Sequence, residues 1–360
     1  MFARCLVLSA VLLSAGHAMA ESDAAVTAAL GLRESAVPVR DMPNWKKPQK
    51  IVVLVDSAAR LAWFQEAAKG TTVVGARNPA EFKAALADAD ALIGTCRADV
   101  VAAGPKLRWV QTQGAGVEDC IPIPRVQSGA VLLTNMQRLN GSNVAEHALA
   151  MMLALSRNIP DAVDAQHKQE WKPSKPGDLA GKTVLIVGLG GIGTEIAKRA
   201  HAFDMNIIAT RNSGRGGPDF VAPIGAPGDL PELIAQADFV VNVTPLTPET
   251  TGLFNAAMFA RMKSTAFFFN LGRGKSVVTD DLVAALNKRT IAGAGLDVVD
   301  PEPLPKSHPL WSAHNVLITP HAADQSDLKT ERMWSVMREN LRRYVAGDKM
   351  LSVVDVKRGY

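Results

Sequence analysis

The chain has 360 residues, of which 48% are hydrophobic and 21% charged, and its formal net charge is +4. This composition excludes a disordered, collagen-like or coiled-coil chain, and at about 150 residues per domain the length predicts roughly two domains. A net charge this small does not indicate binding to nucleic acid or to an anionic membrane. Three cysteines without paired spacing exclude a disulfide scaffold or a zinc ribbon, and no metal site is predicted.

Residues 1–20 have the layout of a secretory signal peptide. A short basic start precedes an unbroken apolar run over residues 5–15, and Ala18-Met19-Ala20 then matches a signal-peptidase site. We expect cleavage near Ala20 and export to the periplasm or beyond. The alternatives are an N-terminal anchor or a misassigned start, and without the signal the protein would be cytoplasmic. The run is too short to span a bilayer, so no stable membrane insertion is predicted.

Cys96 and Cys120 would remain after cleavage, and an oxidising compartment permits a bridge between them. The sequence favours two buried thiols, because it does not place the two Cα atoms within bonding reach.

Residues 21–48 are rich in alanine and then punctuated by prolines, which predicts an N-terminal extension without a core of its own. Apolar runs at 51–55, 71–74 and 91–93, and another from residue 109, then predict strands. Helical stretches at 59–69 and 79–89 separate them. Continuous apolar runs are typical of strands that are buried on both faces of a parallel sheet.

Residues 143–158 have apolar side chains at helical spacing, and a second series of strands follows. Its strands are expected at 183–187, 206–210, 239–243, 266–270, 292–296 and 316–318, with a helix over 194–203. The predicted fold class is therefore α/β, with two doubly wound, Rossmann-like parallel-sheet domains and a ligand cleft between them.

The strand at 183–187 runs directly into a glycine-rich turn, Gly188-Leu-Gly190-Gly-Ile-Gly193, which opens a helix. In this context Gly188 permits a tight turn, Gly190 lets the backbone approach a pyrophosphate, and Gly193 lets the helix pack on the strand. The pattern predicts a dinucleotide site; the alternative is a turn that binds nothing.

No acidic residue stands between Asp204 and Asp219, where an NAD site would have a carboxylate for the ribose 2′-hydroxyl. Arg211 and Ser213 follow the second strand instead, with Arg215 as a further candidate contact. An arginine and a hydroxyl suit a 2′-phosphate, so the sequence favours NADP over NAD as cofactor, with NAD still possible. Arg211 could alternatively be a solvated surface arginine.

Three polar residues follow the last strands of the second series. Arg273 comes after 266–270, Glu302 lies in a proline-rich loop after 292–296, and His321 follows 316–318. The carboxyl ends of parallel strands are where such sheets bind ligands. An arginine fork suits a carboxylate, and a histidine beside a glutamate suits proton transfer at a ketone. Singly they could be a surface arginine, a loop glutamate and a helix-capping histidine.

The chain resembles the D-isomer-specific 2-hydroxyacid dehydrogenases, and most of all their glyoxylate and hydroxypyruvate reductases, over roughly residues 50–350. The resemblance rests on eight short motifs, at residues 110–118, 144–148, 188–193, 244–250, 270–274, 296–297, 301–305 and 319–323. The resemblance implies hydride transfer between NADP(H) and a small 2-keto or D-2-hydroxy acid. It makes His321 the general acid/base, Glu302 its partner and Arg273 the residue that holds the substrate. Ala115 and Gly116 would bind the substrate carboxylate through their amides.

The resemblance also implies a set of cofactor-binding residues, with Asp297 near the nicotinamide carboxamide. Together with the residues derived above, the set comprises Gly188, Gly190, Gly191, Ile192, Gly193, Arg211, Ser213, Thr244, Pro245, Leu271, Gly272, Asp297 and Ala323. One departure is Glu118, since an aspartate is commoner at this position in the family.

By the same resemblance, a substrate domain of residues 49–142 and 324–360 encloses a dinucleotide-binding domain of residues 143–323. A homodimer would form through residues 144–175, with Met151, Met152 and Trp171 at its interface or, for the methionines, in the core. Two rival functions remain from other classes: a nucleotide-sensing binding protein, and a catalytically idle protein on the same fold.

Overall fold

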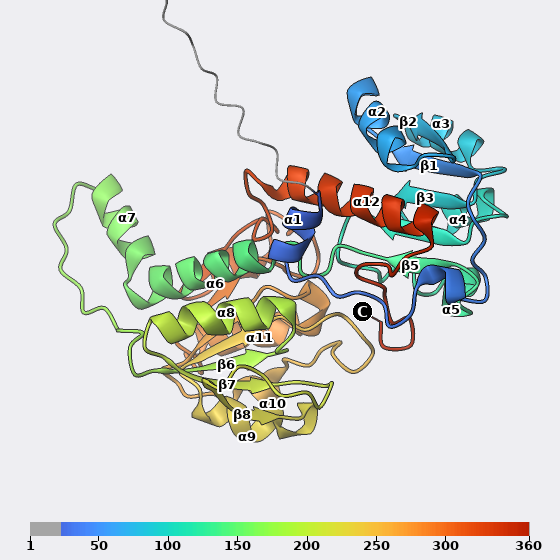
Figure 1. The fold of residues 1–360 in the computed structure, drawn as a ribbon. Helices are drawn as coiled ribbons and strands as arrows, with labels where there is room; N and C mark the ends of the chain where they lie inside the picture. The colour runs from blue at the N-terminus through green and yellow to red at the C-terminus, as the bar shows by residue number, and fades with distance from the viewer. Residues whose placement is uncertain (1–22, 360) are drawn as a thin grey trace, which may run out of the picture.

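The computed structural model describes residues 23–359, which form two α/β domains with parallel sheets (Figure 1). The first sheet has the order β2-β1-β3-β4-β5. Its central strands are short apolar runs, and Ile51, Val52 and Val53 are wholly buried between two layers of helices. The elements of this part are β1 (Lys50–Leu54), α2 (Ala58–Ala67), β2 (Thr72–Ala76), α3 (Pro79–Ala85), β3 (Ala91–Gly94), α4 (Ala98–Ala103), β4 (Trp109–Thr112), α5 (Pro124–Gln127) and β5 (Leu132–Thr134).

The end of the chain returns to this first sheet as the long helix α12 (Lys329–Ala346). Tyr344 stacks on Trp109 of β4 with ring centroids 4.5 Å apart. Buried Asn340 donates to the Gln111 side chain at 2.7 Å and exchanges hydrogen bonds with the backbone of Leu351. Segments from both ends of the chain therefore share one core.

The N-terminal extension packs along α12 rather than forming a core of its own. Helix α1 (Asp23–Ala29) contacts α12, and Asp23 pairs with Arg338 at 2.5 Å. The short 3-10 helix η1 (Val39–Asp41) buries Val39, and Trp45 donates to the Tyr344 carbonyl. Both apolar and polar contacts thus attach the extension to the first domain.

The second sheet has the order β12-β11-β10-β9-β6-β7-β8, so the strand order reverses at β6. Ligands of such sheets bind outside the carboxyl ends of the strands at this reversal. The strands are β6 (Thr183–Val187), β7 (Asn206–Thr210), β8 (Val221–Gly225), β9 (Phe239–Asn242), β10 (Phe267–Asn270), β11 (Gly293–Leu296) and β12 (Val316–Ile318). The main helices are α6 (Gly141–Ser156), α7 (Ile159–His167), α8 (Gly191–Ala202), α9 (Leu230–Leu233), α10 (Ala256–Phe259) and α11 (Thr279–Asn287).

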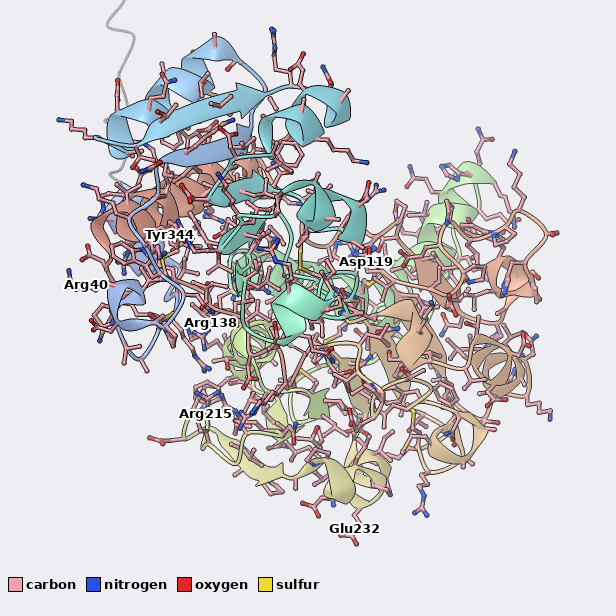
Figure 2. All side chains as sticks on the ribbon, turned by 90° about the vertical axis from the view of Figure 1, so that its right-hand side faces the viewer. Arg40, Asp119, Arg138, Arg215, Glu232 and Tyr344 are labelled. Carbon is pink, nitrogen blue, oxygen red and sulfur yellow. A yellow bond between two sulfur atoms is a disulfide. The ribbon has the colours of Figure 1, made fainter. Side chains whose placement is uncertain are left out.

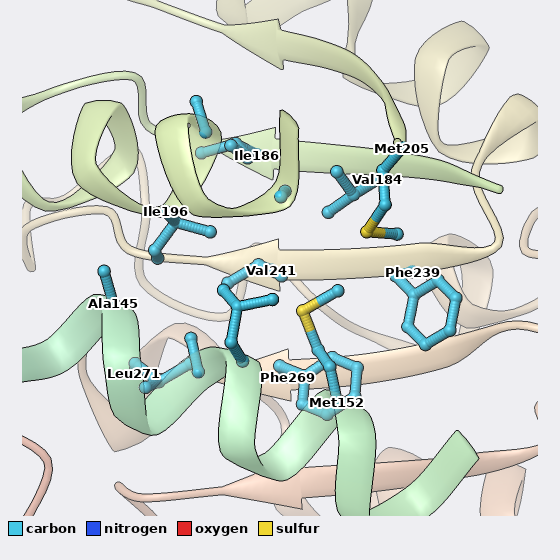
Figure 3. Close-up of a cluster of buried hydrophobic side chains, with 14 of the residues drawn as sticks. Ala145, Met152, Val184, Ile186, Ile196, Met205, Phe239, Val241, Phe269 and Leu271 are labelled. Atoms are coloured by element: carbon cyan, nitrogen blue, oxygen red, sulfur yellow. The ribbon is translucent and has the colours of Figure 1, made fainter. Parts of the chain in front are cut away.

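Helices α6 and α8 pack on each other and cover one face of the second sheet. Figure 3 shows Ala145 and Met152 of α6 beside Val241 and Phe269 of the neighbouring strands. Met151 and Met152 are 2% and 0% exposed, so within this chain both are core residues.

The predicted α/β class with two parallel-sheet domains is confirmed, and some details differ. The helix expected over residues 194–203 begins earlier, because Gly191 is already helical. Strands β5 and β8 were not predicted; both are short edge strands, and β8 contains Pro223. The expected signal peptide lies outside the described residues. Within residues 23–359, no helix is both long and apolar enough to cross a membrane.

Candidate active site

The glycine-rich turn lies at the carboxyl end of β6, where the strand order reverses. Gly188 has a left-handed φ of 104°, which a side chain would oppose. A Cβ on Gly193 would clash with the Gly188 carbonyl oxygen, so only glycine lets α8 approach this closely. A Cβ on Gly190, in contrast, would meet nothing within 4 Å. The turn thus leaves open backbone at the start of α8, as a bound pyrophosphate requires.

The segments after β9 and β10 lie against this turn. A buried network joins Asn242, Asn270 and Ser276, with Asn242 Nδ2 donating to Asn270 Oδ1 at 2.9 Å and to Ser276 Oγ at 2.7 Å. Its oxygens also accept hydrogen bonds from the backbone of Thr244 and Gly272. Four residues expected to line the cofactor therefore occupy adjacent strand ends: Thr244, Pro245, Leu271 and Gly272.

The loop after β7 is folded around Arg211. The Arg211 guanidinium donates to the carbonyl oxygens of Arg215 and Gly216, and Arg215 Nε donates to Ser213 Oγ at 3.3 Å. Burial and the charges of Arg215 and Arg138 lower the pKa of Arg211. The three residues expected at the ribose therefore lie together and concentrate positive charge.

Arg273, after β10, reaches across to the first domain. Its Nε donates to Glu118 Oε1 at 2.7 Å, and its Nη1 donates to the Gly272 carbonyl at 2.9 Å. A Cβ on Gly116 would lie 2.5 Å from Nη2. The structure thus brings Arg273 to the expected carboxylate-binding loop and fixes its guanidinium with Glu118, whose role the sequence did not reveal.

His321 and Glu302 form a hydrogen-bonded pair, His321 Nδ1 lying 2.9 Å from Glu302 Oε2. The other oxygen, Glu302 Oε1, accepts from the Val299 amide at 2.9 Å and so holds the glutamate to its own loop. The side chains of His321 and Glu302 are 51% and 37% exposed. The pair therefore adds little stability, but it can exchange protons with solvent or a ligand.

Asp297, at the end of β11, organises the loop that contains His321. Its carboxylate is 3% exposed and accepts from Thr319 Oγ1 at 2.7 Å and from the amides of Ala322 and Ala323. His147 Nε2 approaches Thr319 Oγ1 at 2.9 Å. His321 itself has a left-handed φ of 51°, a conformation that these hydrogen bonds help to hold. Sequence reasoning assigned Asp297 to the cofactor and missed this support of the loop.

Cys96 and Cys120 form a disulfide, with their Cα atoms 5.4 Å apart. The expectation of two separate thiols was therefore wrong. The cause is the fold: the loop after β4 turns back toward the end of β3, which no local sequence signal reports. The bridge ties the segment that contains Ala115, Gly116 and Glu118 to the first sheet.

The site contains donors for anions rather than ligands for a metal. In the part of the chain that the structure describes, no group of three or more His, Cys, Asp or Glu side chains could hold a metal ion. The open turn at Gly190 and the positive loop at Arg211 instead fit the pyrophosphate and ribose of a dinucleotide.

Comparison with known proteins agrees with this geometry. Residues 149–323 match the family model described as "D-isomer specific 2-hydroxyacid dehydrogenase, NAD binding domain". A human glyoxylate reductase/hydroxypyruvate reductase is 35% identical over 258 residues, which cover 70% of this chain and 78% of the human protein. A glyoxylate reductase of Thermofilum pendens is also 35% identical, over 72% of this chain and 78% of its own length.

Solved structures show the same architecture. A D-isomer specific 2-hydroxyacid dehydrogenase from Xanthobacter autotrophicus, in complex with NADPH and MES, matches with a TM-score of 0.75 and 30% identity, covering 87% of this chain and 100% of its own. An NADPH-dependent glyoxylate/hydroxypyruvate reductase from Sinorhizobium meliloti, in complex with NADP and sulfate, matches with a TM-score of 0.74 and 28% identity over the same shares. The chain therefore belongs to the D-isomer specific 2-hydroxyacid dehydrogenase family and is an NAD(P)-dependent oxidoreductase.

Proposed function

We propose that the protein reduces a small 2-keto acid, such as glyoxylate or hydroxypyruvate, to the D-2-hydroxy acid with NADPH. The observation that supports this most is the His321–Glu302 pair at 2.9 Å, on loops beside the one that presents Arg273. The similar reductases named above act on these substrates, and two of the similar structures contain NADP or NADPH.

Each residue has a defined task in this proposal. Arg273 Nη2 and the amides of Ala115 and Gly116 bind the substrate carboxylate, while Glu118 holds Arg273 in place. Within residues 23–359, His321 Nε2 has no hydrogen-bond partner, so it is free to face the ketone oxygen. When bound, NADPH supplies the hydride that is added to the carbonyl carbon. His321 donates its proton to the forming alkoxide, Glu302 stabilises the charged ring beforehand, and solvent returns the proton afterwards.

The cofactor has a matching set of residues. The amides at Gly190, Gly191 and Ile192 would receive the pyrophosphate at the start of α8. Thr244, Pro245, Leu271 and Gly272 would line the nicotinamide end, and Asp297 and Ala323 would hold the adjoining loop. Arg211 and Ser213 would bind the 2′-phosphate, which is why we favour NADPH over NADH.

The test is NADPH oxidation by the purified chain from residue 21 onward. Glyoxylate, hydroxypyruvate, pyruvate and a phenyl-substituted keto acid are offered separately, and the chirality of the lactate formed from pyruvate is measured. We expect turnover with the small keto acids and a D product. Cofactor binding without turnover of any of them would contradict the proposal and favour a nucleotide-sensing or idle protein.

We further propose a homodimer formed through α6, α7 and the segment that follows. Helix α7 stands away from the body of the molecule (Figure 1), and Ile159, Val163 and Trp171 expose apolar surface there, Trp171 being 99% exposed. Exposed apolar side chains that gather on one projecting segment are typical of an interface. Sedimentation of the wild type and of Trp171→Ser tests this: a monomeric wild type would contradict it.

We also propose that the protein is exported after cleavage near Ala20. The layout of residues 1–20 supports this, and so does the Cys96–Cys120 disulfide, because stable disulfides are typical of oxidising compartments. N-terminal sequencing of the protein from fractionated cells should start at Glu21. An intact Met1 on cytoplasmic protein would contradict export.

A further inference from the structure

Arginines from three separate segments gather beside the ribose end of the nucleotide site. Arg211 and Arg215 lie after β7, Arg138 lies in the linker before α6, and Arg33 belongs to the N-terminal extension. Partial desolvation of its otherwise exposed side chain and the charges of Arg138, Arg215 and Arg211 lower the pKa of Arg33. In Figure 2, Arg138 and Arg215 lie on the same side of the molecule, one above the other. We call these four residues the arginine cluster.

The arginine cluster has no carboxylate to balance it. Among residues 23–359, none of its members forms an ion pair, whereas Arg60, Arg108 and Arg338 all do. Glu34 is next to Arg33 in sequence, but its carboxylate is 2.6 Å from Arg343. Like charges repel one another, so the gathering of these four arginines suggests that an anion binds between them.

Arg138 connects the extension to the glycine-rich turn. Its Nη1 donates to the Gly31 carbonyl at 3.1 Å. A Cβ on Gly191 would lie 2.8 Å from Arg138 Cγ, so the arginine covers the place that a side chain at 191 would fill. Arg138 also has a left-handed φ of 72°, which residues other than glycine rarely adopt. The aliphatic part of Arg138 thus lies over the start of α8, while its guanidinium contacts the N-terminal extension.

The backbone of Arg33 is fixed by the C-terminal segment. The Ser352 amide donates to the Arg33 carbonyl at 2.8 Å, and Glu34 pairs with Leu351 in an antiparallel bridge. The side chain of Arg33 is exposed, although its backbone is held. Exposure beside Arg138 and Arg211 leaves its guanidinium available to a ligand at the loop after β7.

We propose that the N-terminal extension is part of the cofactor site, and that Arg33 and Arg138 join Arg211 and Arg215 in binding the 2′-phosphate of NADPH. A phosphate monoester has two negative charges and three acceptor oxygens, enough for several guanidinium groups. The loop after the second strand of a dinucleotide fold is where the adenosine ribose lies. This inference rests on the proposed preference for NADPH and adds two residues from outside the dinucleotide fold.

The test is calorimetric binding of adenosine 2′,5′-bisphosphate and of AMP, which differ only in the 2′-phosphate. For Arg33→Gln and Arg138→Gln we expect binding of the bisphosphate to weaken about three- to tenfold each, with AMP affinity unchanged. The matched control is Arg40→Gln, which removes a charge from the same extension but from an arginine that faces Asp348. Its affinities should equal those of the wild type.

The outcomes separate this inference from the proposed function. A wild type that binds AMP and the bisphosphate equally would remove the NADPH preference and this inference together. A wild type that prefers the bisphosphate, with Arg33→Gln no weaker than Arg40→Gln, would overturn the inference alone. Arg33 is exposed, so its substitution should leave the unfolding temperature unchanged, and a thermal scan of each variant checks this.

Discussion

The charged side chains at the carboxyl ends of β10, β11 and β12 are held by charged groups or by loop amides. Within residues 23–359, the arginines after β7 donate only to carbonyl and hydroxyl oxygens of their own loop and form no ion pair. Arg273 is held by Glu118, His321 by Glu302, and Asp297 by the loop amides. The arginine cluster, in contrast, forms no ion pair within residues 23–359. The difference suggests two tasks. Groups that must orient a reacting substrate are held in place before the substrate binds. Groups that only bind a charged ligand can take that ligand as their counter-charge.

The largest effect is expected from removing the proposed proton donor, His321, beside the substrate. We expect His321→Gln to lower kcat by about 10³-fold, because glutamine cannot exchange the proton that the alkoxide needs. NADPH affinity, measured by fluorescence titration, should stay unchanged. The control is His314→Gln, an exposed histidine just before β12, whereas His321 follows the carboxyl end of the same strand. Weakened cofactor binding with turnover preserved would contradict the role of His321.

The second prediction concerns a substitution that replaces the planar guanidinium of Arg273 but keeps its positive charge. We expect Arg273→Lys to raise the KM for the keto acid by about 10²-fold, because a lysine cannot hold Glu118 and the substrate carboxylate together. Steady-state kinetics measures this, with Arg261→Lys as an exposed control in the same domain. Equal KM values for the two variants would show that Arg273 does not bind substrate.

The third prediction sharpens the contrast by testing whether partners position the reacting groups. Glu118→Ala should raise the substrate KM about tenfold with a smaller change in kcat, because it frees the Arg273 guanidinium. Glu118→Gln keeps an acceptor oxygen for Nε and should restore most of the loss. If both variants lose activity equally, the charge of Glu118 matters rather than its hold on Arg273.

The smallest expected effect on activity comes from the disulfide. Its removal in Cys96→Ser/Cys120→Ser should destabilise the fold by about 3 kcal/mol, the loop-closure value for a separation of 24 residues. The substrate KM should rise about two- to fourfold as the loop of Gly116 loosens, while NADPH affinity stays constant. Denaturant unfolding and kinetics measure the two effects. A larger change in NADPH affinity than in substrate KM would contradict the separation between the substrate-binding residues and the arginine cluster.

Local patterns were enough to predict every strand of the two sheets except β5 and β8, the glycine-rich turn, and the strand-end positions of Arg273, Glu302 and His321. Those features depend on hydrophobic periodicity and turn chemistry within a few residues. The contacts that complete the site depend on distant segments. Glu118 and Arg273 are 155 residues apart, and the backbone of Arg33 is held by Ser352, more than 300 residues further along the chain. The pairing of Cys96 with Cys120 likewise depends on a loop path that no local sequence signal fixes.

The most direct test is the ratio of kcat/KM for NADPH to that for NADH, with glyoxylate at a fixed saturating concentration. We expect the wild type to favour NADPH at least about tenfold, because only NADPH has a 2′-phosphate for the arginine cluster. Arg211→Gln should bring the ratio close to one without changing the glyoxylate KM. Equal kcat/KM values for NADPH and NADH in the wild type, or a higher value for NADH, would contradict the account that the arginine cluster binds the 2′-phosphate of the cofactor.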